Sequence, residues 1–92
     1  MVLKNIIIIN AESDYGGAIY NYGTLTITNS TLANNKADYG GAITNSGTLT
    51  ITNSTLINNT ASTLGGAIRN NVTVNIINSK LINNTAYDGG AI

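Results

Sequence analysis

The sequence predicts an all-β protein, a parallel β-helix of about four coils, and three observations indicate this fold class. The tetrapeptide GGAI occurs four times, so the chain repeats every 24 or 25 residues; the copies begin at Gly16, Gly40, Gly65 and Gly89. Segments such as TLTIT alternate polar and apolar residues, which is typical of a strand. Repeats this short cannot bury an apolar face alone, so they must stack into a solenoid.

The repeat boundaries indicate one domain that spans residues 1–92. We expect a partial coil, three complete coils and the beginning of another, at residues 1–15, 16–39, 40–64, 65–88 and 89–92. The middle coil has 25 residues, and its additional residue lies within Ser62–Leu64. We expect a turn at that point, because a turn tolerates an insertion better than a paired strand does.

Each coil is predicted to hold three short strands. In the first complete coil they lie at about Gly17–Asn21, Thr24–Thr28 and Thr31–Ala33, with matching strands in the later coils. Thr and Ile are β-branched and favour strands. The Asn, Ser and Gly residues between these segments favour turns. No segment of helical length has the helical period of about 3.6 residues.

Parallel stacking places equivalent residues of successive coils above one another, and alternation then predicts which columns face inward. Four apolar columns are expected inside: Leu25, Leu49 and Val74; Ile27, Ile51 and Ile76; Ile8, Leu32, Leu56 and Leu81; and Ile19, Ile43, Ile68 and Ile92. Each fully buried Ile or Leu contributes about 1.5–3 kcal/mol relative to exposure.

Asn and Gly residues are predicted at the corners of the coils. Two Asn columns are expected to form ladders of hydrogen-bonded amides: Asn29, Asn53 and Asn78, and Asn34, Asn58 and Asn83. Asn also tolerates the left-handed backbone that a corner needs. The Gly pairs are expected where a coil turns sharply or lies close to its neighbour, because such positions need a positive φ or lack room for a Cβ.

The repeat resembles that of two groups of surface proteins. GGAI, followed after about a dozen residues by a hydrophobic–x–Asn element, is similar to the repeat of chlamydial polymorphic outer-membrane proteins. The segment GGAIYNYGTLTITNSTLANN, which begins at Gly16, resembles the tandem repeats of adhesin-like surface proteins of methanogenic archaea. The resemblance covers essentially all of the chain. It implies a right-handed parallel β-helix at the cell surface or outside the cell, acting in adhesion or as a surface stalk.

Composition argues against several classes of function. The chain has no Cys and no His, only 9% of its residues are charged, and its formal net charge is zero. We therefore expect no cofactor, no metal site, no nucleic-acid partner and no docking on anionic lipid. Membrane insertion and an export signal are not expected either, because the apolar run Ile6–Ile9 is too short.

The acidic residues do not form a recognisable catalytic motif, so we expect a protein without enzymatic activity. Asp14 and Asp38 share one repeat position, but Thr63 replaces them in the next coil. Together with Glu12 and Asp88, they are interpreted as solvated turn residues. A calcium site at Glu12 and Asp14 is equally weakly indicated, because the glycine-rich calcium repeat is absent.

Two sets of surface residues are candidates for ligand binding, as an alternative to a purely structural role. The first is an outward grid of threonines that resembles ice-binding surfaces, formed by Thr24, Thr26, Thr28, Thr48, Thr50 and Thr52. The next coil breaks this grid with Asn75 and Ile77. The second set is the tyrosines, whose rings are suited to stacking on the sugars of a glycan or a host-cell surface: Tyr15, Tyr20, Tyr22, Tyr39 and Tyr87. Tyr20 and Tyr22 are the foremost candidates, because they lie on either side of Asn21 near one corner. Five N-glycosylation sequons also occur, at Asn29, Asn53, Asn58, Asn71 and Asn83.

The two ends of the predicted solenoid carry no cap. The first coil begins with apolar residues and the last stops at Gly89–Ile92. Unpaired strand edges favour pairing with another chain, and a head-to-tail contact of this kind propagates into a fibre. The leading hypothesis is therefore a non-enzymatic structural or adhesive module of the cell surface. We expect it to be a fragment of a longer array that stacks end to end into filaments.

Overall fold

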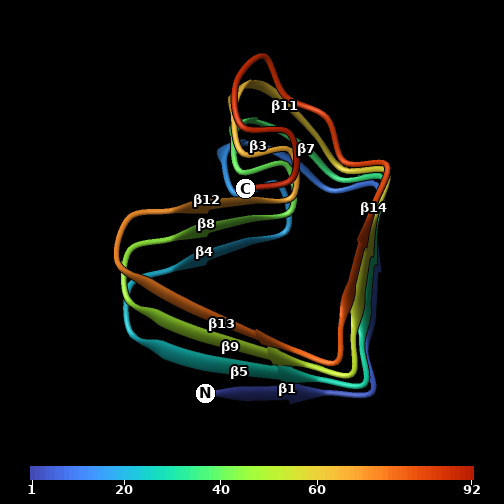
Figure 1. Ribbon diagram of the computed structural model, residues 1–92, viewed down its shortest axis with the longest axis vertical. Coiled ribbons are helices and arrows are strands. Elements are labelled where there is room, and N and C mark those ends of the chain that lie inside the picture. Colours follow the sequence, from blue (N-terminus) through green and yellow to red (C-terminus); the bar gives the residue numbers. More distant parts are fainter.

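The computed structural model describes residues 1–92, which form a parallel β-solenoid of about three turns with fourteen strands and no helix. Figure 1 views the solenoid nearly along its axis, so that successive coils overlie one another with their strands side by side. The predicted all-β fold class is confirmed. The core lies between the sheets, where equivalent residues of neighbouring coils pack together.

The strands belong to four parallel sheets, each with at most one strand per coil. The first sheet contains β1 (Val2–Lys4), β5 (Thr24–Thr28), β9 (Thr48–Thr52) and β13 (Thr73–Ile77). The second contains β2 (Ile7–Ile9), β6 (Thr31–Ala33), β10 (Thr55–Ile57) and β14 (Lys80–Ile82). The third contains β3 (Glu12–Tyr15), β7 (Lys36–Tyr39) and β11 (Thr60–Leu64). The fourth contains β4 (Ile19–Asn21), β8 (Ile43–Asn45) and β12 (Ile68–Asn70).

A complete coil therefore holds four strands rather than the predicted three. The three expected segments correspond to β4, β5 and β6, and the additional strand is β7 with its equivalents β3 and β11. The sequences of these strands, such as KADY, contain Ala and charged residues, which have a low preference for strands. They become extended because they pair in register with the neighbouring coils, where Ala37 and Ala61 are buried against the core.

The predicted inward columns are confirmed by the register of the sheets. Leu25 pairs with Leu49, and Leu49 with Val74; Ile27 pairs with Ile51, and Ile51 with Ile76. The other two columns are likewise in register from Ile8 to Leu81 and from Ile19 to Ile68. Ile92 lies beyond the last strand, at the open C-terminal end of its column, and stays 49% exposed.

The corner Asn residues have the predicted left-handed backbone, but the predicted amide ladders are wrong. Asn29, Asn53 and Asn78 have φ of 51°, 50° and 47°, yet their side chains are exposed and take part in no hydrogen bond between coils. The ladders form in other columns, Asn21–Asn45–Asn70 and Asn35–Asn59–Asn84. A left-handed residue turns its side chain outward, and in the Asn-Asn pairs the following residue points into the core instead.

The Gly pairs lie where the prediction placed them, and the two glycines of a pair meet different requirements. Gly40 has a φ of 65°, which favours glycine. Gly41 has no room for a side chain, because a Cβ would lie 2.7 Å from the Thr60 nitrogen and closer still to the Gly66 carbonyl oxygen.

The additional residue of the 25-residue coil is accommodated where predicted, but within a strand rather than in a turn. Ala61 pairs with Ala37 and Leu64 pairs with Tyr39, so the register shifts between these two pairs. The shift is a β-bulge in β11, which absorbs one residue while the strand continues to pair.

Candidate interaction surfaces

Four of the five tyrosines gather at one corner of the solenoid, beside the β3–β4 connection. We call Tyr15, Tyr20, Tyr22 and Tyr39 the tyrosine cluster. The rings of Tyr20 and Tyr22 stack with centroids 4.5 Å apart and an interplanar angle of 10°. Tyr15 stacks on Tyr39 at 5.1 Å and 10°, and it also contacts Tyr20 at 5.9 Å. These distances are typical of favourable aromatic pairs, so the four rings form one continuous aromatic surface.

A cation and a hydroxyl group complete this corner. The Arg69 guanidinium lies 4.9 Å from the centroid of the Tyr39 ring, in a cation–π contact. Thr44 lies in register between Tyr20 in the coil below and Arg69 in the coil above. Its hydroxyl donates to the Tyr39 carbonyl oxygen at 2.8 Å, and the residue is completely buried. The surrounding side chains therefore cover Thr44, although its position on β8 faces outward.

The outer part of the cluster remains open to solvent. Tyr22 is 75% exposed, whereas Tyr20 is 40% exposed. Hydrogen bonding with the Tyr22 hydroxyl, and then with Ser46, lowers the pKa of Tyr20, and the contact with Tyr20 raises the pKa of Tyr22.

The sequence predicted all four tyrosines of the cluster as candidates for stacking on sugars, with Tyr20 and Tyr22 foremost, and missed Arg69. Tyr15 and Tyr39 occupy one repeat position, directly before the Gly pair, and they are register partners in β3 and β7. An alignment of the repeats could have grouped these two residues. Nothing in the sequence places Arg69 over the ring of Tyr39, because that contact depends on the direction of both side chains.

The six candidate threonines form the predicted outward grid, two coils high. Thr24, Thr26 and Thr28 of β5 are in register with Thr48, Thr50 and Thr52 of β9. The grid ends at Val2 and Lys4 of β1 on one side, and at Asn75 and Ile77 of β13 on the other. Its extent across the coils is therefore limited to two rows of hydroxyl groups.

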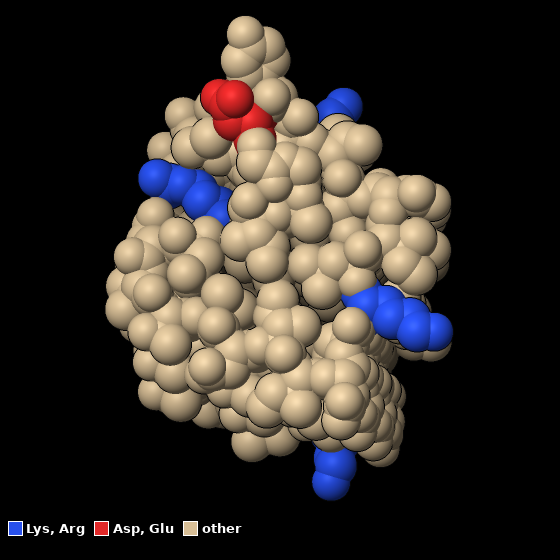
Figure 2. Space-filling model, in the orientation of Figure 1, with Lys and Arg blue, Asp and Glu red and all other residues tan.

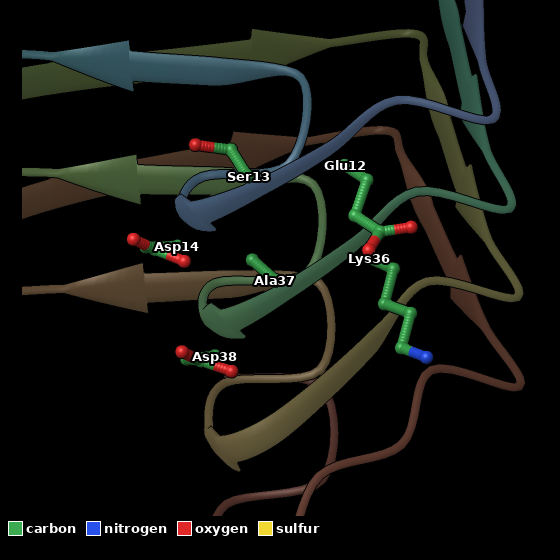
Figure 3. A pocket seen from close by; sticks show the side chains of 6 residues that line it. All are labelled: Glu12, Ser13, Asp14, Lys36, Ala37 and Asp38. Carbon is green, nitrogen blue, oxygen red and sulfur yellow. The ribbon is translucent and has the colours of Figure 1, made fainter.

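A shallow pocket of about 240 Å³ lies over β3 and β7, lined by Glu12, Ser13, Asp14, Lys36, Ala37 and Asp38. Asp14 and Asp38 lie side by side in successive coils, as predicted, and Glu12 lies beside Lys36 on the other side of the strands (Figure 3). One Asp38 oxygen accepts a hydrogen bond from the Ser62 hydroxyl at 2.8 Å. Asp88 lies apart from this pocket, beside Leu64. No group of three or more Asp, Glu, His or Cys side chains is placed to hold a metal ion.

Charged side chains are sparse over the rest of the surface. Figure 2 shows a face on which the basic residues lie apart from one another, with uncharged surface between them. The chain contains four Lys and Arg residues in total. A nucleic-acid site needs a continuous basic surface, and no such surface is present on this face.

The N-terminal end of the solenoid presents unpaired strand edges. Inside the solenoid, one column of backbone N–H groups donates to the coil below: Thr31 to Ile6 O at 3.0 Å, Thr55 to Ser30 O at 2.9 Å and Lys80 to Ser54 O at 2.9 Å. Ile7 occupies the same column through its pairing with Thr31, but no coil lies below it. Its side chain is also 74% exposed.

The C-terminal end presents the opposite edges. The chain runs over β12 in its last residues, where the Ala67 and Ile68 nitrogens donate to the Ala91 carbonyl oxygen at 2.9 and 3.0 Å. A pocket of about 410 Å³ opens at this end; it is lined by Leu64, Gly65, Arg69, Asn70, Asn71, Asp88, Gly89 and Ile92. β13 and β14 are the outermost strands of their sheets at this end.

All five sequon asparagines are exposed, including the four that belong to the columns predicted to form amide ladders; they are Asn29, Asn53, Asn58, Asn71 and Asn83. The inward amides belong to other columns, as described above. None of these five side chains is therefore protected from modification by burial.

One stretch of the chain is similar to a known repeat. It extends from the turn that follows β9 to the residue after β12, and it includes the Gly pair at Gly65. Residues 53–71 match the Chlamydia polymorphic membrane protein repeat. This match confirms the resemblance to the chlamydial repeats, whereas the likeness to methanogen adhesins stays a prediction. No curated protein and no solved structure is significantly similar to the chain. No helix in the structure has the length and hydrophobicity that a membrane span requires.

Proposed function

We propose that this chain is a non-enzymatic structural module of a cell-surface protein, in which stacked coils form a rigid adhesive or spacer segment. The observation that carries this proposal is the β-solenoid itself, whose coils pair in register and whose end strands have free edges. The match to a membrane-protein repeat supports a location at the cell surface. A role without catalysis is supported by the pocket over β3 and β7: the chain has no His, and the Glu12 carboxylate in this pocket lies beside Lys36, on the other side of the strands from Asp14 and Asp38.

We also propose that the two ends join through further coils of the same repeat, supplied by a second copy of the chain. The registers support this proposal. Val2 pairs with Thr26, Thr26 pairs with Thr50, and Thr50 pairs with Asn75, so Val2 and Asn75 have the same repeat position. In the same way, Ile7 has the same repeat position as Lys80. In a stack, β1 of the second copy would therefore lie over β13 of the first copy, and β2 of the second copy would lie over β14 of the first. Gly89–Ile92 would fill the position below β4, where the first coil has no GGAI segment of its own.

Replacing Ile7 with Pro is expected to weaken this self-association at least about tenfold, which corresponds to roughly 1.4 kcal/mol. In a stack the Ile7 N–H would donate to the Ser79 carbonyl oxygen of the next copy, as Lys80 does to Ser54 within the chain. Proline removes that donor without breaking a bond inside the solenoid. Sedimentation velocity over a range of concentrations would measure the change.

The matched control for this variant is Ile7→Thr, which introduces the residue found at this position in the next two coils. It keeps the N–H group, so association is expected to remain. Circular dichroism would check that both variants keep the β-solenoid. A wild-type chain that stays monomeric at every concentration would refute the stacking proposal, while leaving the fold unaffected.

A further inference from the structure

The later coils show which residues occupy the positions of Tyr20 and Tyr22 elsewhere in the solenoid. The position of Tyr20 is occupied by Thr44 and Arg69 in the following coils. Tyr22 lies one residue beyond the paired Asn21, and the residues that follow the paired Asn45 and Asn70 are Ser46 and Asn71. The solenoid therefore forms with small polar residues or an Arg at these two positions. Aromatic rings here are not a requirement of the fold.

The two rings are nevertheless held in a defined arrangement. Tyr22 is 75% exposed, so it contributes little to the core, yet its ring stacks on Tyr20 at 4.5 Å and 10°. Tyr20 in turn rests on Tyr15, which is stacked on Tyr39. A ring that is exposed and already ordered loses little conformational freedom when a ligand stacks on it. This arrangement is suited to binding.

Neutral polar groups border the rings. The Ser46 hydroxyl accepts a hydrogen bond from the Asn71 amide at 3.2 Å in the coils above. Both groups keep further capacity: the Ser46 hydroxyl, which also bonds to Tyr20, has a second acceptor lone pair, and the Asn71 amide has an oxygen acceptor and a second N–H. An aromatic face beside hydroxyl and amide groups complements a ligand that has a flat apolar face and a rim of hydroxyl groups.

We propose that Tyr20 and Tyr22, with Ser46 and Asn71, form a carbohydrate-binding surface that takes a pyranose ring. The C–H face of the sugar stacks on the exposed ring of Tyr22, and the sugar hydroxyls bond to Ser46 and Asn71. This inference does not depend on the stacking of the solenoid ends. A nucleobase could also stack on these rings, but single-stranded nucleic acid needs a basic groove for its phosphates, and only Arg69 lies beside the cluster.

Intrinsic tyrosine fluorescence provides a direct test, because the chain has five Tyr and no Trp, and four of the five lie in the cluster. The probes are maltotriose, cellotriose, chitotriose and mannotriose, each titrated into the wild-type chain. We expect a saturable change in emission with at least one of these oligosaccharides. No saturable change with any of them would overturn the proposal.

The decisive variant is Tyr22→Ser, which introduces the residue of the next coil and so leaves the fold intact. It is expected to weaken binding of the responding oligosaccharide about tenfold, whereas Tyr87→Ser is expected to have no effect. Tyr87 is a matched control because it is 86% exposed and lies outside the cluster. Equal losses in the two variants would overturn the proposal.

Discussion

Replacing Gly41 with Ala is expected to destabilise the protein by more than about 4 kcal/mol, or to prevent folding. The added Cβ would lie 2.7 Å from the Thr60 nitrogen and 2.8 Å from its carbonyl carbon, and nearer still to the Gly66 carbonyl oxygen. All of these atoms belong to the backbone of paired or tightly turning segments. They cannot move aside without breaking hydrogen bonds between coils, so urea unfolding followed by circular dichroism should show the loss.

Gly23→Ala is the matched control for this change. No atom lies within 4 Å of the position that its Cβ would take, and its φ is not positive. We expect a change of at most about 1 kcal/mol, in the stabilising direction if the unfolded chain loses entropy. If Gly41→Ala were as well tolerated as Gly23→Ala, the close approach of the coils at the Gly pairs would be contradicted.

The second large effect is expected for Asn45→Ala, with a loss of about 3–5 kcal/mol in the free energy of unfolding. Asn45 is fully buried in the middle of an amide ladder. Its Nδ2 donates to Asn70 Oδ1 at 2.8 Å, to Thr73 O at 2.8 Å and to Gly47 O at 3.0 Å. Its Oδ1 accepts from Asn21 Nδ2 at 2.8 Å and from Gly47 N at 3.2 Å. Alanine removes all five of these hydrogen bonds at a buried position, and chemical denaturation would measure the cost.

Asn58→Gly distinguishes the observed ladders from the ones that the sequence suggested. Asn58 is exposed, has a φ of 56°, and its side chain makes no hydrogen bond to another coil. Glycine adopts this backbone conformation readily, so the stability should change by less than about 1 kcal/mol. A loss comparable to that of Asn45→Ala would place an amide ladder at the corner and contradict the assignment.

The apolar columns were predictable because GGAI fixes the length of the repeat and TLTIT fixes the alternation. Once the coils stack in parallel, Ile27 must meet Ile51 and Leu25 must meet Leu49, whatever the shape of the coil. The fourth strand was not predictable in this way. KADY becomes a strand only through its pairing with the coils on either side, which local preference does not reveal.

The amide ladders show where alternation fails. In the pair Asn34-Asn35, either residue could face the core, and the sequence does not distinguish them. The left-handed backbone at Asn34 turns its side chain outward and directs Asn35 inward, where it bonds to Asn59. The candidate binding residues were also predictable only in part. Tyr20 and Tyr22 were predictable as aromatic residues on either side of Asn21, but the stack on Tyr15 and Tyr39 required the side-chain directions.

Nuclear Overhauser effects between isoleucine methyl groups test the central claim, that successive repeats stack in register one coil apart, most directly. Parallel strands lie roughly 4.8 Å apart, so a methyl-labelled sample should show strong contacts from Ile27 to Ile51 and from Ile51 to Ile76. The contact from Ile27 to Ile76 should be much weaker, because these residues are two coils apart. Absence of the Ile27–Ile51 contact, with strong contacts from Ile27 to residues of other columns instead, would contradict the stacked coil.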